Sequence, residues 1–442
     1  MVKKVTLMSL AIPIFFEVIL FMTLGVVDTL MLSRISDQAA GAVGIANQLI
    51  NFTNIIFTII SVGAAILIAQ FIGAKKWVDC HMTIIVAYVV LTIIGLVCSI
   101  GLFFFGPDLL ILIGITPGLM GYASDYIRIV GIFMFLQAFL NISTVTMRSY
   151  GYSKQTLYIT ATMNIINIVG DYALLFGAFG LPALGAAGVA IATSISRLIA
   201  VILSTIFVFK HIVPLSAISY IKNFPKHILR MLLKLGFPAA LENLSYNVSQ
   251  IVITGIVLVY LGEEMSIVRT YVGSIVTFAL IVTIAISQAN QIIIGRLIGE
   301  GLMDEAYHVC IKNFKIAFYV MCGIGVIFYF FGGHLMRIFS DNPRIIEWGM
   351  IILALDAFLE LGRIFNIVFI SGLRGAGDVI FSVAIGLVFM WGIAAAGAYV
   401  FVVIFGWGLP GVWLALLLDE WVRGILNFLR WHNKKWVTKA LV

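Results

Sequence analysis

The sequence predicts an all-α membrane protein whose twelve transmembrane helices form two six-helix bundles. This expectation rests on an apolar composition, on twelve long apolar segments and on an internal repeat. Of the 442 residues, 62% are hydrophobic and 11% are charged, whereas a soluble globular domain carries about 25% charged residues. The apolar runs are continuous instead of alternating, which favours helices over a transmembrane β-barrel.

Each of the twelve apolar segments is long enough to cross a bilayer, which takes about 20 residues of helix. The first is too long for a signal-peptide core and has no small-residue cleavage site after it, so we expect a retained helix. Several exceed the required length, which predicts tilts or kinks. The segments lie near 7–32, 46–72, 84–106, 122–147, 156–178, 188–209, 232–261, 271–296, 313–331, 346–372, 380–405 and 410–429.

The chain repeats itself with a shift of about 225 residues. The stretch "LAIPIFFE" (10–17) matches "LGFPAALE" (235–242), and "MRSYG" (147–151) matches "LRGAG" (373–377). Each half holds six expected helices, so both halves enter the bilayer in the same direction. Such parallel repeats are related by a pseudo-two-fold axis along the membrane normal.

The repeat predicts two lobes and a linker. We expect an N-terminal lobe over residues 1–209, a C-terminal lobe over residues 232–442, and a basic cytoplasmic linker over residues 210–231, which contains two prolines. Two six-helix lobes suit a substrate that passes from one side of the membrane to the other.

The net charge of +7 reports orientation and does not predict nucleic-acid binding. With the N-terminus in the cytoplasm, most Lys and Arg residues between the helices fall on the inner side. The positive-inside rule then places both ends in the cytoplasm. We expect a monomeric, multi-pass protein of the inner (plasma) membrane with anionic lipid as a partner. The outer segments hold only Arg34, Arg269, Arg337 and Arg344.

Several ionisable residues lie inside the apolar segments. A charge at mid-helix costs about 2.5–3.5 kcal/mol on insertion scales, so such residues usually face the protein interior or a water-filled cavity. They are candidates for function. The residues are Glu17, Asp28, Asp171, Arg197, Glu242, Asp356, Glu360 and Arg363.

Two acids share one face of the first helix. Glu17 and Asp28 are eleven residues apart, roughly 16 Å along a helix axis, with Asp28 in the outer half. Glu17 follows Pro13 by four residues, and Glu242 repeats that arrangement in the second half. Glu17 and Glu242 either line a substrate cavity or make hydrogen bonds that pack helices together.

The segment 156–178 carries a polar stripe. Thr160, Asn164, Asn167 and Asp171 follow helical spacing on one face of an otherwise apolar helix. One Asn is often a contact between helices, but four polar groups ending in a carboxylate favour a hydrated site. Asn164 is a candidate for the substrate cavity.

Asp28 and Asp171 together predict an ion site. Two neighbouring carboxylates in a low dielectric cannot both stay ionised cheaply, so such a pair holds a proton or a small cation such as Na⁺. Carboxylate and amide oxygens suit a hard cation. Arg197 either neutralises one of the two acids or has a structural role.

A second charged cluster lies in the segment 346–372. Asp356, Glu360 and Arg363 follow helical spacing, so Arg363 can pair with Glu360 and leave Asp356 less compensated. The cluster either lines the substrate cavity or is a self-satisfied ion pair. The halves differ here, because Asp28 aligns with Ile253 in the repeat.

Four stretches of the sequence resemble one family. "IPIFFEVILFMTLGVVDTLMLSRI", "NIINIVGDYALLFGAFGLPALGAAGVAIATSIS", "AISQANQIIIGRLIGEG" and "ISGLRGAGDV" are similar to the multidrug and toxic compound extrusion (MATE) transporters. The C-terminal end is similar to a bacterial branch. The resemblance implies a V-shaped pair of bundles that exports organic cations by H⁺ or Na⁺ antiport. It assigns the coupling ion to Asp28, Asn167 and Asp171. Where some members have a cation-binding carboxylate, this chain has Arg363.

The expected function is therefore secondary active export of amphipathic, mostly cationic drugs by alternating access. H⁺ or Na⁺ is the coupling ion, and no other cofactor is expected. Six embedded acids against two embedded arginines favour cationic cargo, and the chain has no phosphate-binding loop for ATP. A lipid-linked precursor flippase is the alternative, but it would need a basic cavity. A membrane enzyme finds little support, because metal-ligand motifs such as HExxH are absent.

Overall fold

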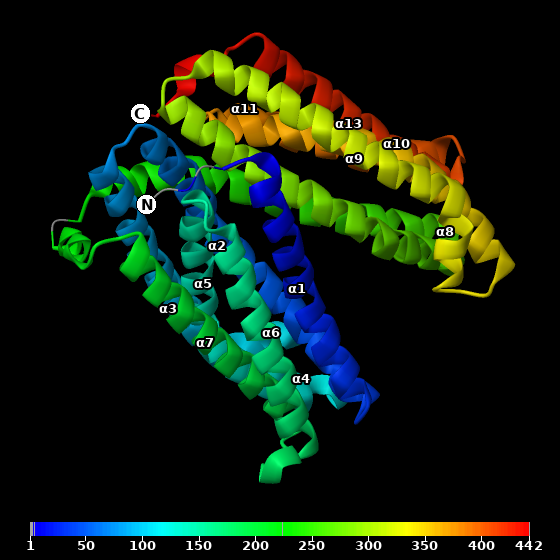
Figure 1. Ribbon diagram of the computed structural model, residues 1–442. Coiled ribbons are helices and arrows are strands. Elements are labelled where there is room, and N and C mark those ends of the chain that lie inside the picture. Colours follow the sequence, from blue (N-terminus) through cyan, green and yellow to red (C-terminus); the bar gives the residue numbers. More distant parts are fainter. Residues whose placement is uncertain (1–2, 4, 223, 442) are drawn as a thin grey trace. The chain divides into compact units, whose positions relative to one another are not determined.

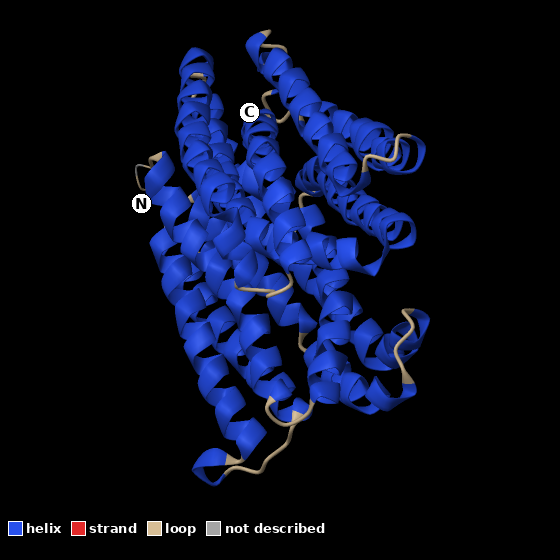
Figure 2. Ribbon diagram, turned by 90° about the vertical axis from the view of Figure 1, so that its right-hand side faces the viewer, coloured by secondary structure: helices blue, strands red, loops and turns tan. Residues whose placement is uncertain are grey.

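The computed structural model describes residues 3, 5–222 and 224–441, and within them the chain consists of helices joined by short loops, with no strand (Figure 2). All twelve apolar segments expected from the sequence fall on helices. Asn223, in the expected linker, lies outside the described residues. The elements are α1 (Leu7–Ser33), α2 (Asp37–Gly73), α3 (Trp77–Leu112), α4 (Pro117–Ile132), α5 (Met134–Ser149), α6 (Ser153–Phe176), η1 (Ala178–Gly180), α7 (Ala186–His211), η2 (Leu215–Ile221), α8 (Lys226–Gly299), α9 (Met303–Arg337), α10 (Pro343–Gly375), α11 (Val379–Phe389), η3 (Met390–Ala395), α12 (Ala396–Tyr399), η4 (Val400–Ile404), α13 (Gly408–His432) and η5 (Val437–Lys439).

Eight helices among the described residues are long and apolar enough to cross a membrane. The pair α4 and α5 becomes a ninth span if it is counted as one helix, although it bends by 49°. The chain is therefore a multi-pass membrane protein. The helices α10 and α13 are not among the eight, and both carry buried charged residues described below.

Besides α4 and α5, which replace the single expected helix 122–147, two elements differ from the simple helices that the sequence predicts. The expected segments 232–261 and 271–296 are joined in α8, which is 74 residues long and broken only at Gly262. That residue has φ 83° and ψ −177°, a conformation that is essentially restricted to glycine. The expected helix 380–405 contains two π-helical stretches, η3 and η4, on either side of the short α12.

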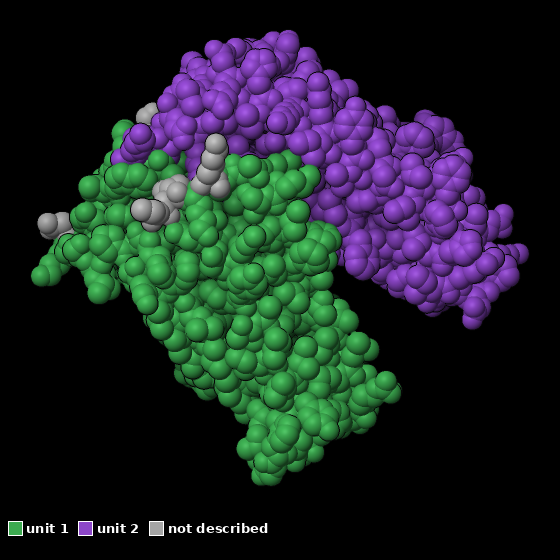
Figure 3. Space-filling view, in the orientation of Figure 1, with its two compact units in different colours: residues 1–72, 76–237 green, residues 73–75, 238–442 purple. Residues whose placement is uncertain are grey.

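The chain divides into two compact units, coloured separately in Figure 3. Unit 1 comprises Met1–Ile72 and Lys76–Phe237, and unit 2 comprises Gly73–Lys75 and Pro238–Val442. The boundary between Phe237 and Pro238 therefore falls inside α8.

In unit 1, α1 packs against α6, and α6 packs against α7 (Figure 1). The contact between α6 and α7 is close at Gly170, where an added Cβ would lie 2.9 Å from the Cβ of Ala192. The next residues along the two helices, Asp171 and Thr193, both accept a hydrogen bond from Asn167. In unit 2, α10 packs against both α9 and α13.

Candidate functional site

A buried polar cluster in unit 1 joins α1, α6 and α7. Asp28, Asn167, Asp171 and Thr193 are each at most 2% exposed. The Asn167 amide donates to Asp171 Oδ1 at 3.5 Å and to Thr193 Oγ1 at 3.3 Å. The Asp28 side chain lies close enough to Asp171 and Thr193 to interact with both. The structure thus brings together the three residues that the resemblance assigns to the coupling ion.

Three oxygen atoms of this cluster lack a hydrogen-bond partner among the described residues. They are Oδ1 of Asp28, Oδ2 of Asp171 and Oδ1 of Asn167. Buried polar atoms are rarely left without partners, because each one costs free energy. Two carboxylates, an amide oxygen and a hydroxyl form a donor set that fits a proton or a hard monovalent cation.

Two further side chains act on this cluster electrostatically. Arg197 on α7 and Tyr126 on α4 are buried, and both interact electrostatically with Asp28. In the described part of the chain, Arg197 forms no ion pair with Asp28, and its Nε atom has no hydrogen-bond partner. The Tyr126 hydroxyl donates to Oδ1 of Asn47 on α2 at 3.3 Å. Arg197 therefore supplies one positive charge that acts on Asp28.

The sequence did not single out Asn47, Tyr126 or Thr193 as parts of this site. None of the three is a charged residue inside an apolar segment, and uncharged polar residues on membrane helices often only join one helix to another. The available signal was for Thr193 alone, which lies in the stretch "GVAIATSIS" that resembles the family.

The expected polar stripe on α6 divides into two groups. Asn167 and Asp171 join the cluster with Asp28. Thr160 instead donates to Glu17 Oε1 at 3.5 Å, and the Asn164 amide donates to the carbonyl of Thr160 at 2.9 Å. The amide of Asn164, expected in the substrate cavity, is thus bonded within its own helix.

Glu17 and Glu242 make matching ion pairs in the two units. Glu17 is 2.9 Å from Arg148 and accepts a 2.7 Å hydrogen bond from Thr156. Glu242 is 2.6 Å from Arg374. The two arginines come from the repeat-related stretches "MRSYG" and "LRGAG". Because both carboxylates are buried and paired, the geometry favours the packing role for them over the expected place in a cavity.

In unit 2, the acids of α10 are unequally compensated. Arg363 forms an ion pair with Glu360. Asp356 accepts a 2.9 Å hydrogen bond from the indole N–H of Trp413 on α13. Both acids are at most 2% exposed, and Oδ2 of Asp356 and Oε2 of Glu360 have no hydrogen-bond partner among the described residues.

Three charged residues of α13 complete this cluster, and the sequence reasoning overlooked them. Arg423 donates to Asp419 Oδ1 at 3.0 Å and lies 3.2 Å from Glu420 Oε1. Glu420 also lies 3.6 Å from Arg363 and accepts a 2.8 Å hydrogen bond from Asn366. The signal was "LDEWVRG", which places charges inside an apolar segment.

The completed cluster in unit 2 is acidic overall. Ion pairs link three buried carboxylates to two buried guanidinium groups in one network, and the buried carboxylate of Asp356, on the same helix as Glu360, is held outside these ion pairs by Trp413. The cluster is thus more than the self-satisfied pair that one helix could make alone. In the described part of the chain, no group of three or more His, Cys, Asp or Glu residues is arranged to hold a metal ion.

Comparison with known proteins identifies the family. The family model MatE matches residues 13–173 and again residues 238–400, so both halves of the repeat match it. An uncharacterized transporter of Bacillus subtilis, YisQ, is 38% identical over 99% of this chain and 96% of its own length. A probable multidrug resistance protein, NorM of Thermotoga maritima, is 26% identical over 99% of this chain and 94% of its own length.

Solved structures show the same fold. A MATE protein in a bent conformation matches with a TM-score of 0.89 over 98% of this chain and 96% of that chain, at 19% identity. A transporter of the MOP superfamily from Pyrococcus furiosus matches with a TM-score of 0.88 over the same shares, also at 19% identity. The resemblance read from the motifs is thereby confirmed: this chain belongs to the bacterial branch of the MatE family of membrane transporters.

Proposed function

We propose that this transporter exports amphipathic, mostly cationic organic compounds in exchange for H⁺ or Na⁺ by alternating access. The observation that carries the proposal is the buried Asp28–Asp171 pair with its unpartnered oxygens. Relatives described as probable multidrug resistance proteins support the choice of cargo. A lipid-linked precursor is a less suitable cargo, because its negatively charged phosphate groups would be repelled by the acidic buried clusters of this protein.

The proposal includes twelve membrane crossings. The eight apolar helices and the bent pair α4–α5 supply nine, the break at Gly262 divides α8 into two crossings, and α10 and α13 supply the last two. The crossings form two pseudo-symmetric lobes, residues 1–209 and 232–442, joined by the linker 210–231. The protein works as a monomer in the inner membrane.

The coupling ion acts by removing a repulsion. When both Asp28 and Asp171 are ionised, their repulsion reaches about 4 kcal/mol at a separation of 4 Å and an effective dielectric near 20. A bound proton or Na⁺ relieves it, so the loaded and empty forms of unit 1 favour different packing of α1 against α6. An ion shifts such an equilibrium only through its different affinities for the two states. Asn167 and Thr193 hold Asp171 and Asp28 in position for the ion.

Efflux from membrane vesicles tests the proposal. We expect a fluorescent organic cation to be transported when a pH gradient or a Na⁺ gradient is imposed, and each gradient is applied alone to identify the ion. Asp28→Asn should lose at least 90% of the driven transport, an effect of about 1.4 kcal/mol or more. The matched control is Asp125→Asn, the same change at an exposed residue of α4.

Two outcomes would contradict this proposal. Wild-type transport by the Asp28→Asn variant would show that coupling lies elsewhere, and the Asp356–Glu360 cluster would then be the next candidate. Absence of transport under both gradients, with folded protein, would show that drug antiport is not the function.

A further inference from the structure

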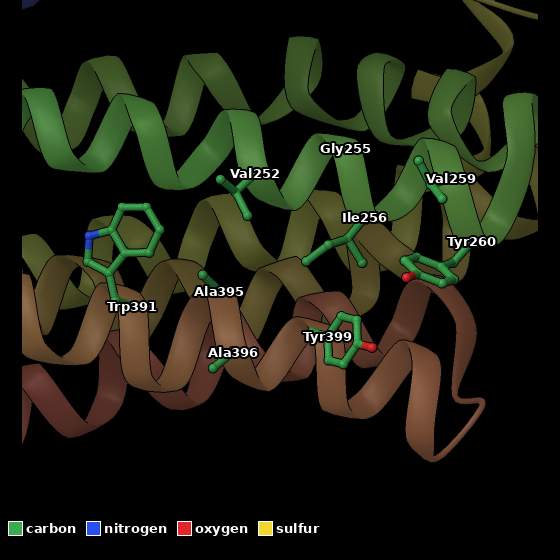
Figure 4. A pocket seen from close by; sticks show the side chains of 9 residues that line it. All are labelled: Val252, Gly255, Ile256, Val259, Tyr260, Trp391, Ala395, Ala396 and Tyr399. Carbon is green, nitrogen blue, oxygen red and sulfur yellow. The ribbon is translucent and has the colours of Figure 1, made fainter.

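Unit 2 contains a groove between α8 and the segment that carries the π-helical turns (Figure 4). Its volume is about 540 Å³, within the range of 300–1,000 Å³ that is typical of small-molecule sites. The groove is separate from the charged cluster of α10 and α13, none of whose residues line it. The lining residues are Val252, Gly255, Ile256, Val259, Tyr260, Trp391, Ala395, Ala396 and Tyr399.

One wall of the groove is a regular helical face. Its residues on α8 lie at positions i, i+3, i+4, i+7 and i+8 from Val252 to Tyr260, which is the spacing of one side of an α-helix. The opposite wall comes from η3 and α12, where the chain leaves regular α-helical geometry. Single π turns inside helices occur frequently at functional sites.

Three aromatic side chains stand at the two ends of the groove. The rings of Tyr260 and Tyr399 meet edge to face at one end, with centroids 6.0 Å apart and an interplanar angle of 84°. Trp391 lies at the other end (Figure 4), where its indole N–H donates to Ser245 Oγ at 2.9 Å. That hydrogen bond fixes the indole ring, and all three rings remain partly exposed.

The middle of the groove has room for a flat group. A Cβ atom added at Gly255 would meet nothing within 4 Å. Ala395 and Ala396 present only methyl groups from the other side. Val252 and Ile256 also lie between the rings (Figure 4). Together with the small residues opposite them, they line an apolar slot that a planar molecule can enter.

The lining includes no charged side chain. A charged group placed inside would lose its water without a compensating partner, which is costly. An aromatic ring, by contrast, gains edge-to-face and stacked contacts with Tyr260, Tyr399 and Trp391. A flexible alkyl chain fills the same volume but gains none of those ring contacts.

We propose that this groove binds the planar aromatic part of the exported compound and leaves the compound's charged group outside. This inference rests on the proposed export function and adds the class of cargo: amphipathic compounds with a fused or planar ring system. Rigid aromatic cargo is preferred over alkyl cargo of equal charge.

The test uses ethidium, a planar aromatic cation, and dodecyltrimethylammonium, a flexible alkyl cation of the same charge. Binding of each to the purified full-length protein in lipid nanodiscs is measured by fluorescence or competition, without any ion gradient. Gly255→Leu fills the groove. Its matched control is Gly273→Leu, also on α8, where a Cβ again meets nothing within 4 Å and which does not line the groove.

We expect Gly255→Leu to raise the Kd of ethidium roughly tenfold or more and to leave dodecyltrimethylammonium within about twofold. Gly273→Leu should change neither. Tyr399→Leu keeps the slot open but removes a ring, so it should also weaken ethidium selectively. This second variant decides the matter if Gly255→Leu does not fold.

Equal weakening of both cations would overturn the proposal, because the groove would then accept any apolar chain, including a lipid. Unchanged ethidium binding in both groove variants would overturn it as well. The two proposals are tested independently. The export proposal is tested by gradient-driven efflux, and the groove proposal is tested by binding affinities measured at equilibrium.

Discussion

Individual residues in this transporter show how the partner of a buried charge decides its role. Glu17 and Asp28 share a helix and a face, yet Glu17 has Arg148 and two hydroxyl groups, whereas Asp28 faces a second carboxylate. A fully paired acid stabilises the packing of its helix. An acid beside another acid holds excess negative charge and is suited to take up an ion.

A test at this scale is Glu17→Gln, together with its repeat-related counterpart Glu242→Gln. Each change removes the carboxylate from a largely buried ion pair, which costs about 3 kcal/mol. We expect a lower melting temperature and an equal loss of binding for cationic and neutral dyes. Adding Arg148→Gln to Glu17→Gln should cost less than the sum of the two single changes.

Glu263→Gln is the control for this pair of variants, because Glu263 is exposed. A selective loss of cationic dyes at unchanged thermal stability would instead assign Glu17 and Glu242 to the substrate cavity.

The sequence marked the candidate site through spacing along one helix, through acids in apolar segments and through the family resemblance. Spacing along one segment placed Asn167 beside Asp171, and burial in apolar runs marked Asp28. The contributions of Thr193, Tyr126 and Asn47 depend on how three other helices are rotated about their axes. An apolar segment fixes its length and depth in the bilayer but leaves that rotation open, so these partners required the structure.

At the scale of elements, hydropathy predicted where helices lie but not where their geometry changes. An apolar pattern indicates that a segment lies in the hydrocarbon. There the backbone N–H and C=O groups can be satisfied by α-helical or by π-helical hydrogen bonds. The pattern therefore could not distinguish η3 and η4 from their surroundings. The apolar pattern likewise predicted a connecting segment between residues 261 and 271, whereas the helical geometry of α8 is interrupted at Gly262 alone.

The elements that should respond to the coupling ion are α1 and α6. With nitroxide labels at Ser33 and Phe176, near the ends of these two helices, we expect wild-type distances to depend on pH or on Na⁺. Asp28→Asn removes the repulsion with Asp171 permanently, so its distances should match the loaded wild type under every condition. Double electron–electron resonance measures the distance between the two labels in the wild type and in the variant.

The exposed variant Asp125→Asn serves again as the control and should respond like the wild type. Identical, condition-independent distances in all three proteins would mean that α1 and α6 do not carry the coupling step.

At the scale of the whole molecule, the distribution of basic residues predicts orientation. We expect both ends of the chain on the cytoplasmic side and the segment 181–184 outside. Epitope tags at either terminus should be reached by antibody only in permeabilised cells, and a tag inserted within 181–184 should be reached in intact cells. A terminal tag that is accessible in intact cells would contradict the predicted topology.

The matching ion pairs Glu17–Arg148 and Glu242–Arg374 have a consequence for the origin of the two halves. Their carboxylates and guanidinium groups occupy equivalent places in both units, whereas Asp28 has only Ile253 as its counterpart. If a duplicated six-helix ancestor gave rise to this chain, the paired charges are inherited architecture that neither copy could discard. Acids without a counterpart, such as Asp28, arose after the duplication. The two halves therefore share an architecture but differ in the chemistry of their buried acids.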